Sequence, residues 1–345
     1  MASLTATAVF ARKSFIIVGG ILLVVLILFV GLNLLSPVFM SLFPKTPDPA
    51  LVAFGKLPAI SFENGIKPPS DVIYKIETVS GDLKEQKSKL KVFEIGKTDV
   101  KFGDMSRVNG IAQALQFPTP PILVTNDSAT YQDKTDKNKT LQIGILTKNF
   151  ILKSDYLNNT DLIANLEKNE EANKQGAIAL LKSLGINQAY YPPEKITLVK
   201  YKIDGGKLSE VLTLATTNLE RVNFAHADID KIPVVYTKYQ EPKINVLAAN
   251  GRVLAANVNA ADIQLFRFST YPTRGIAQAF EDLKAGKAIY NKDLNGKTFN
   301  IRDLKMAYLD TDTNESFLQP VYVFVGDDGL EAYVRAISDN YIKGD

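Results

Sequence analysis

The sequence predicts an α+β protein in which a single N-terminal transmembrane helix is followed by antiparallel sheets with helices packed on one face. Three observations support this fold class. An apolar run occupies residues 15–35, short alternating runs separated by turn residues dominate the rest of the chain, and a few segments with helical spacing lie between them.

The composition is that of an ordinary folded protein. The chain has 345 residues, of which 46% are hydrophobic, and its 40 Lys and Arg nearly balance its 37 Asp and Glu. With a net charge of +3, the protein lacks the excess of basic residues that is typical of nucleic-acid binding, so no nucleic-acid partner is expected. Without cysteine there are no disulfides or thiolate metal sites, and the single histidine excludes a multi-histidine site.

The N-terminal segment predicts a membrane anchor. Residues 15–35 form an uninterrupted run of 21 residues without a charge, and about 20 apolar residues suffice to cross a bilayer. Arg12 and Lys13 precede the run, which predicts a cytoplasmic tail at residues 1–13, a transmembrane helix at 14–35 and an extracytoplasmic C-terminal region. A cleaved signal peptide and a buried core helix are the alternatives; the long run and the lack of an A-x-A-like cleavage site disfavour the first.

The region after the expected anchor divides by composition. Residues 36–70 are rich in proline, which favours extended backbone, so they predict a stalk. Residues 71–160 and 161–345 are expected to be two α+β modules. A six-residue similarity between 110–115 and 275–280, each copy expected to open a helix, leaves open whether the modules are related by duplication.

The elements of the two modules follow from periodicity and turn residues. Alternation or continuous apolar runs predict strands, 3.6-residue spacing predicts helices, and Gly or Asn-Gly clusters predict the turns of hairpins. In order, the expected elements are strands at 72–79 and 90–95, a helix at 105–116, strands at 141–146 and 150–152, a helix at 161–184, and hairpins at 196–214, 244–258 and 317–337.

The search for catalytic, cofactor and metal motifs identifies no site. His226 is the only imidazole, and a lone histidine in a strand-like segment is more often structural than catalytic. The acidic segment 310–315 has oxygen-bearing side chains that suggest calcium, but Glu315 occupies the position of the turn glycine in an EF-hand loop, so a polar turn is the better interpretation. No catalytic residue, cofactor or metal ligand is therefore expected.

The C-terminal third supplies a family resemblance. From Pro233 the sequence reads PVVYTKY, INVLAANGRVLAANV, IQLFRFSTYP, TRGIAQAFEDLKAG, FNIRDLKMAYL and FLQPVYVFVGDDGLEAYVRAIS. This order resembles the extracytoplasmic module of YycH/YycI-type regulatory proteins, which act with the cell-wall two-component system of Gram-positive bacteria, and more broadly PepSY-type modules. The resemblance implies a protein without catalysis that modulates a membrane sensor kinase through its span and its outer domain.

The expected function is therefore that of a membrane-anchored binding or regulatory protein of the cell envelope. Its expected partners are the membrane and a membrane protein, either a sensor kinase or an envelope complex. Tyr271 and Arg274, at a strand-to-helix junction, are the candidate contact surface. Two alternatives remain: a structural tether of an envelope complex, and a hydrolase that acts on envelope glycan or peptide with carboxylates brought together by folding.

Overall fold

The computed structural model divides the chain into two compact units, Met1–Pro49 and Ala50–Asp345. It describes residues 18–26, 29–30, 48–62, 65–96, 104–147, 149–159, 169–237, 242–311 and 315–344. Arg12 and Lys13, on which the expected membrane orientation rests, lie outside these ranges. In the first unit the described residues 18–26 and 29–30 are helical.

The expected fold class is wrong in two respects. Among the described residues, no helix has both the length and the apolar character needed to cross a bilayer. Sheet also dominates the described residues, with 39% strand against 21% helix. The transmembrane and single-pass description is therefore corrected to a mainly β architecture.

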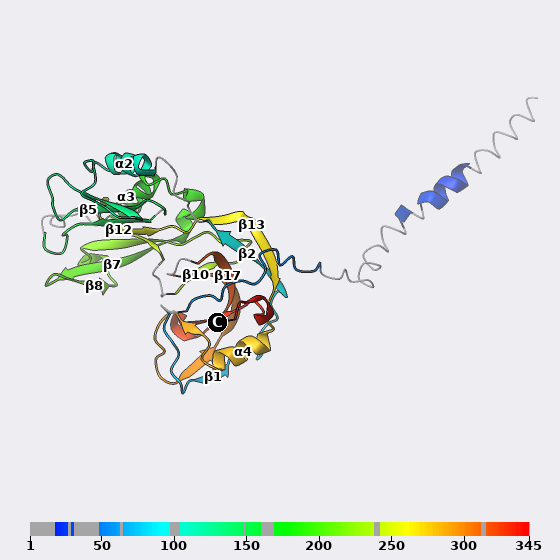
Figure 1. Ribbon diagram of the computed structural model, residues 1–345. Coiled ribbons are helices and arrows are strands. Elements are labelled where there is room, and N and C mark those ends of the chain that lie inside the picture. The colour runs from blue at the N-terminus through cyan, green and yellow to red at the C-terminus, as the bar shows by residue number, and fades with distance from the viewer. Residues whose placement is uncertain are drawn as a thin grey trace, which may run out of the picture. The chain divides into compact units, whose positions relative to one another are not determined.

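A nine-stranded antiparallel sheet forms one half of the second unit (Figure 1). Its strands run in the spatial order β3 (Leu123–Val124), β4 (Ser128–Gln132), β5 (Thr140–Gly144), β6 (Asn149–Lys153), β12 (Arg252–Asn259), β11 (Ile244–Ala249), β9 (Leu219–Phe224), β7 (Ile196–Asp204) and β8 (Lys207–Val211). The pairing of β6 with β12 joins segments about 100 residues apart. The sheet thus takes strands from both sides of residue 160, where the sequence analysis places a module boundary.

Two helices cover one face of this sheet. α3 (Glu170–Ser183) contacts β9, β11 and β12, and α2 (Asp104–Ala114) contacts β5. Both helices turn small or branched apolar residues inward, and the core they share with the sheet includes Val108, Ala112, Ala177, Leu181, Val222 and Val246. α3 begins at the N-cap Asn169, whose side chain accepts a hydrogen bond from Ala172 N, and ends before Gly185, whose φ of +72° favours glycine.

A seven-stranded sheet forms the other half. Its central strands are β16 (Asp303–Asp310), β17 (Phe317–Val325) and β18 (Glu331–Arg335), flanked by β10 (Val234–Tyr236) and β14 (Ile289–Tyr290), while β2 (Lys89–Ile95) joins β17 to β13 (Ile263–Pro272). β10 pairs with β16 in parallel and the other pairs are antiparallel. β1 (Ile73–Ile76) and β15 (Thr298–Ile301) form a separate parallel pair.

Five short 3₁₀ segments occupy turns among the described residues: η2 (Gln188–Tyr190), η3 (Pro193–Lys195), η4 (Leu214–Thr216), η5 (Asp327–Gly329) and η6 (Asp339–Tyr341).

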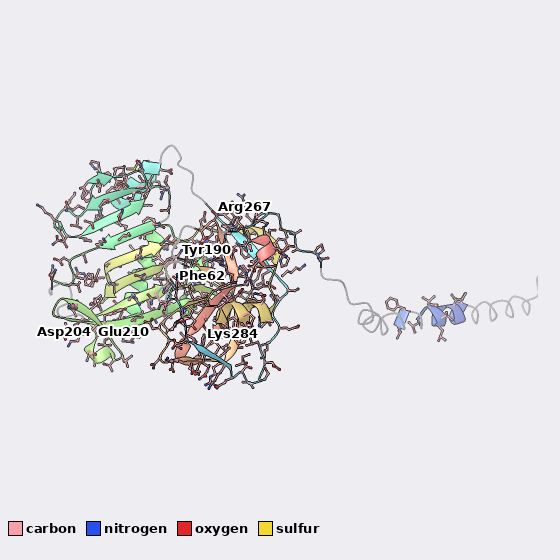
Figure 2. The ribbon with its side chains drawn as sticks, turned by 60° about the horizontal axis from the view of Figure 1, so that its bottom comes forward. Phe62, Tyr190, Asp204, Glu210, Arg267 and Lys284 are labelled. Carbon is pink, nitrogen blue, oxygen red and sulfur yellow. The ribbon has the colours of Figure 1, made fainter. Side chains whose placement is uncertain are left out.

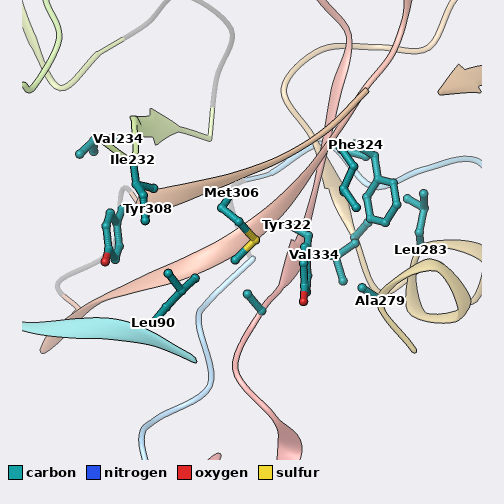
Figure 3. Packing of buried hydrophobic residues seen from close by; sticks show 14 of the residues in the cluster. Leu90, Ile232, Val234, Ala279, Leu283, Met306, Tyr308, Tyr322, Phe324 and Val334 are labelled. Carbon is teal, nitrogen blue, oxygen red and sulfur yellow. The ribbon is translucent and has the colours of Figure 1, made fainter. Parts of the chain in front are cut away.

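Both faces of β17 are buried, which explains its almost continuous apolar sequence. One face, with Tyr322 and Phe324, packs with α4 (Ile276–Lys284) and with β18 (Figure 3). The other face, with Val321 and Val323, packs against Ile60. Leu57 is fully buried and forms a bridge with Ile342. Residues 50–62, expected in the proline-rich stalk at 36–70, are therefore part of the compact unit.

The predicted hairpins are confirmed, whereas the six-residue similarity occupies unlike places. β7–β8, β11–β12 and β17–β18 pair as expected, and Asn250 and Gly251 both have the positive φ of a type I′ turn. The copy at 110–115 begins in the middle of α2 and runs past its end, while that at 275–280 begins at the N-cap of α4. The expectation that each copy opens a helix is thus wrong for the first.

The turn between β11 and β12 touches α3 so closely that one helix position requires glycine. A Cβ at Gly176 would lie 2.3 Å from the carbonyl oxygen of Gly251. The side chain of Asn173, one turn earlier, accepts a hydrogen bond from Gly251 N at 2.9 Å and donates one to the buried Glu220 at 2.8 Å. The helix and the hairpin are therefore positioned by contacts that leave no room for a methyl group.

We expect Gly176→Ala to lower the free energy of unfolding by about 1–3 kcal/mol, because backbone must move to relieve the overlap. The matched control is Gly110→Ala in α2, where a Cβ meets nothing within 4 Å; there the better helix propensity of alanine should add about 0.5–1 kcal/mol. Urea unfolding followed by circular dichroism measures both variants. Equal effects of the two substitutions would contradict the close contact.

Candidate functional site

The candidate site is a cavity of about 460 Å³ beside the junction of β13 and α4. Its volume lies within the range of small-molecule sites. Apolar side chains of Phe62 (labelled in Figure 2), Ile289 and Val334 form part of its lining. The charged part of the lining consists of four cationic side chains and two carboxylates: Lys67, Arg274, Lys287, Arg335, Asp282 and Asp339.

The backbone around Arg274 places this residue at the meeting point of several elements. Arg274 follows β13 and comes two residues before α4. Its backbone N–H donates to Ala336 O at 2.8 Å, and its carbonyl oxygen accepts a hydrogen bond from the hydroxyl of Tyr322 on β17. Because both backbone polar groups are satisfied by the neighbouring sheet, the start of the side chain is fixed.

The guanidinium of Arg274 is buried and fully engaged. Nη1 donates to Asp282, Nη2 donates to Asp339 Oδ1 at 2.6 Å, and Nε and Nη2 approach Ile337 O at 3.3 and 3.0 Å. The side chains of Arg274 and Asp282 are 7% and 4% exposed, whereas that of Asp339 is 76% exposed. Removing one partner of a buried ion pair leaves an uncompensated charge and typically costs about 3–5 kcal/mol.

The cavity carries an excess of positive charge. The positive charge of Arg274 is balanced by Asp339. That of Lys287 is balanced by Asp282, whose Oδ1 lies 3.2 Å from Lys287 Nζ. Lys67 and Arg335 form no ion pair with any described carboxylate. The six charged groups therefore leave two positive charges facing a mostly apolar wall.

Arg335 retains donors for a ligand. Its Nη2 donates to Ile60 O at 2.9 Å, and its guanidinium lies 5.3 Å from the centroid of the Phe62 ring. Its Nε is buried without a hydrogen-bond acceptor among the described residues. A guanidinium has five N–H donors, and an unsatisfied buried donor costs free energy. An anion in the cavity that draws this side chain toward itself would lower that cost.

The residues expected to form a contact surface are both buried. Tyr271 is 0% exposed; its hydroxyl donates to Gly55 O at 2.9 Å, and its ring meets that of Tyr341 edge-on. Arg274 is 8% exposed and lines the cavity. The strand-to-helix junction therefore holds both side chains inside the fold.

Of the residues that line the cavity, sequence reasoning identified only Arg274. A signal exists for two of the residues that it missed, Asp282 and Arg335. Asp282 falls between Ala279 and Leu283 on the apolar face of α4, and Arg335, the last residue of β18, stands between the buried Val334 and Ala336. A charge at a position where the periodicity demands an apolar side chain indicates a buried partner or a site. For Asp339, in a polar turn, the sequence carries no such signal.

A second polar cluster surrounds His226, which is 5% exposed. Its ring is stacked on Tyr190 and meets Tyr191 edge-on, with centroid distances of 5.7 and 5.5 Å. Nδ1 lies 2.7 Å from Ala227 O, so this nitrogen donates its hydrogen, and the backbone N–H donates to the hydroxyl of Tyr236 at 3.0 Å. The ring is held by packing on both a face and an edge, which gives it a structural role.

Asp310 is the charged group of this second cluster. It forms an ion pair with Lys243 at 2.7 Å, and both side chains are 10% exposed. Burial lowers the pKa of His226, while Asp310 acts in the opposite direction. Burial and Asp310 together raise the pKa of Tyr191 and Tyr236.

The acidic segment 310–315 is described only at its ends. Glu315 Oε1 accepts a hydrogen bond from Ser61 N at 2.9 Å, which ties it to the N-terminal segment of the unit. Across the described ranges, no group of three or more His, Cys, Asp or Glu is arranged to hold a metal ion.

Comparison with solved structures shows only distant likeness. No family model matches the chain, and no curated protein matches it. An uncharacterised protein from Eubacterium rectale, known from a crystal structure, is similar over 79% of this chain and 88% of its own, with a TM-score of 0.39 and 10% sequence identity. A likeness of this size carries no inference about fold or function.

We expect the stability of the protein to fall as the pH drops from 7 to 5. The folded chain binds the His226 proton less readily than the unfolded chain, whose histidine pKa is about 6.5. Protonation therefore favours unfolding below about pH 6.5, and the effect levels off below the folded pKa. Urea unfolding of the wild type and of His226→Phe should show a smaller slope for the variant in this window.

Because His226 is the only histidine, its imidazole gives one NMR signal that can be titrated directly. A midpoint at or above pH 6.5 in the folded protein would contradict the effect of burial.

Proposed function

We propose that the Ala50–Asp345 unit is a binding and regulatory module whose ligand is an anionic group, a carboxylate or a phosphate, carried on an apolar body. The observation that supports the proposal is the cavity at Arg274, where two uncompensated positive charges adjoin an apolar wall. A ligand of this kind would place its apolar part against Phe62, Ile289 and Val334. Its anion would lie near Lys67 and Arg335.

The magnitudes favour a contribution from both parts of such a ligand. Burial of apolar surface contributes about 25 cal/mol per Å², so a ring of roughly 100 Å² adds about 2–3 kcal/mol. A hydrogen bond between a charged donor and an anion adds about 1.5–3 kcal/mol where water is excluded. Lys67 is exposed, so its contribution is that of a surface ion pair, about 0.2–1 kcal/mol.

The regulatory part of the proposal rests on the expectation drawn from the C-terminal third. A sensor kinase or an envelope complex as partner, an extracytoplasmic location and the lack of catalysis all stay predictions. The hydrolase alternative needs a carboxylate with a raised pKa that can act as a general acid. The pKa values of Asp133 and Asp327, by contrast, are lowered, by backbone hydrogen bonds from Thr135 and by Arg302 respectively.

We expect phenyl phosphate and phenylacetate to bind the full-length protein, and the neutral analogue phenylacetamide to bind at least tenfold more weakly. Isothermal titration calorimetry measures the three affinities at low ionic strength. Added salt should weaken binding of the anions, because the exposed part of the charge is screened. Equal affinities for phenylacetate and phenylacetamide would sink the proposal.

The two cationic side chains should contribute unequally. Arg335→Gln should weaken phenyl phosphate binding about tenfold or more, and Lys67→Gln about two- to fivefold, since the lysine is more exposed. The matched control is Lys207→Gln on the edge strand β8, which removes the same charge from an exposed side chain outside the cavity lining. Arg335→Lys, which keeps the charge, separates loss of charge from loss of packing on Phe62. Thermal melting confirms that each variant is folded.

A further inference from the structure

We propose that the carboxylate of Asp339 is an internal stand-in for the ligand anion, and that a bound anion displaces it from Arg274 and so loosens the C-terminal segment from Leu57. This inference rests on the proposed function and adds its regulation. Binding of a ligand in the cavity would thereby change the contacts of Leu57, near the start of the Ala50–Asp345 unit.

Asp339 is the exchangeable partner of the buried guanidinium. Asp282 lies on α4 with 4% of its side chain exposed, whereas 76% of the Asp339 side chain is exposed to solvent. An exposed carboxylate loses little hydration when it binds and regains it readily when it leaves. Arg274 would keep Asp282 and Ile337 O, so its buried charge would stay paired during the exchange.

Electrostatics favour this exchange. With Asp339 in place, its carboxylate and that of Asp282 both line the cavity, and both repel an incoming anion. When Asp339 withdraws, Nη2 of Arg274 becomes available and the cavity gains one net positive charge. The ligand anion thus takes over the interaction that Asp339 makes with Nη2 at 2.6 Å.

Asp339 is the first residue of η6, which connects the cavity to the N-terminal segment of the unit. Tyr341, in the same short helix, accepts a hydrogen bond from Leu57 N at 2.8 Å through its carbonyl oxygen. Lys343 N donates in turn to Leu57 O at 2.7 Å. Release of Asp339 removes one of the contacts that hold the start of this segment at Arg274; the bonds of Arg274 to Ile337 O and of Ser338 N to Pro272 O stay in place.

The segment that η6 holds leads directly to the boundary between the two units at residue 49. It is also bound at the end of β13, where Val52 N donates to Thr270 O at 3.1 Å and Ala53 N donates to Ser269 Oγ at 2.7 Å. Tyr271, next along β13, donates to Gly55 O. Loss of the η6 contacts would release Leu57, while residues 52–53 would stay attached to β13. The expected response is therefore local.

The first test uses Asp339→Asn in the full-length protein with phenyl phosphate as the probe. Removal of the competing charge should tighten binding by roughly fivefold, in line with the contribution of an exposed ion pair. Glu210→Gln is the control, since Glu210 is an exposed carboxylate on the edge strand β8, away from Phe62 (Figure 2). Unchanged affinity in Asp339→Asn would overturn the stand-in role.

The second test follows amide hydrogen exchange of Leu57 and Lys343 by NMR. Saturation of the wild type with phenyl phosphate should speed exchange at both amides severalfold and leave the β11–β12 hairpin unchanged. Asp339→Asn should show faster exchange before any probe is added. Phenylacetamide should produce no change.

The outcomes separate the two proposals. Binding of phenyl phosphate with unchanged exchange at Leu57 and Lys343 would overturn the regulatory inference and leave the binding function standing. Failure of the anions to bind both the wild type and Asp339→Asn would overturn the proposed function, and the inference with it.

Discussion

The burial of one arginine side chain is the constraint on which the C-terminal half of the structure depends. A guanidinium has no neutral form at physiological pH, so inside a protein it must be surrounded by acceptors. Arg274 obtains them from three places: α4 through Asp282, the end of the chain through Asp339, and the backbone after β18 through Ile337 O. Meeting this single demand fixes the positions of a helix and of the C-terminal segment relative to the seven-stranded sheet.

The same demand explains why a cavity with positive charge lies beside a well-packed core. Asp282 and Asp339 form their ion pairs with Arg274 and Lys287. Lys67 and Arg335 therefore have no carboxylate partner among the described residues. The apolar wall follows from the burial of both faces of the sheet: Phe62 packs on the face that bears Ile289, while Val334 lies on the face packed against α4. The proposed site is therefore a product of how the core is closed by the segment at 50–62.

Local structure was readable from the sequence where a short motif determines it. Asn250–Gly251 and the glycine-bounded turn after β17 each demand a backbone conformation that only a few residue types adopt, and both hairpins are found as predicted. Residue patterns were misleading where the outcome depends on distant partners. The similar hexapeptides at 110 and 275, for example, sit in different parts of their helices. The polar cavity required Arg274, Arg335 and Phe62 to meet from three separate parts of the chain, which no local pattern encodes.

The long-range pairing of the strands has a consequence for synthesis. β6 pairs with β12, whose first residue is synthesised about 100 residues later. The separation along the chain between β2 and its partner β13 is larger still. A nascent chain that has just emerged past β6 therefore exposes an apolar strand edge with no partner, and unpaired edges of this kind are the sites at which chains associate wrongly. Topologies dominated by such separations also fold slowly. The order in which the ribosome delivers the strands, and whatever shields β6 during that interval, thus becomes as much a condition for a functional molecule as the contacts of the finished fold.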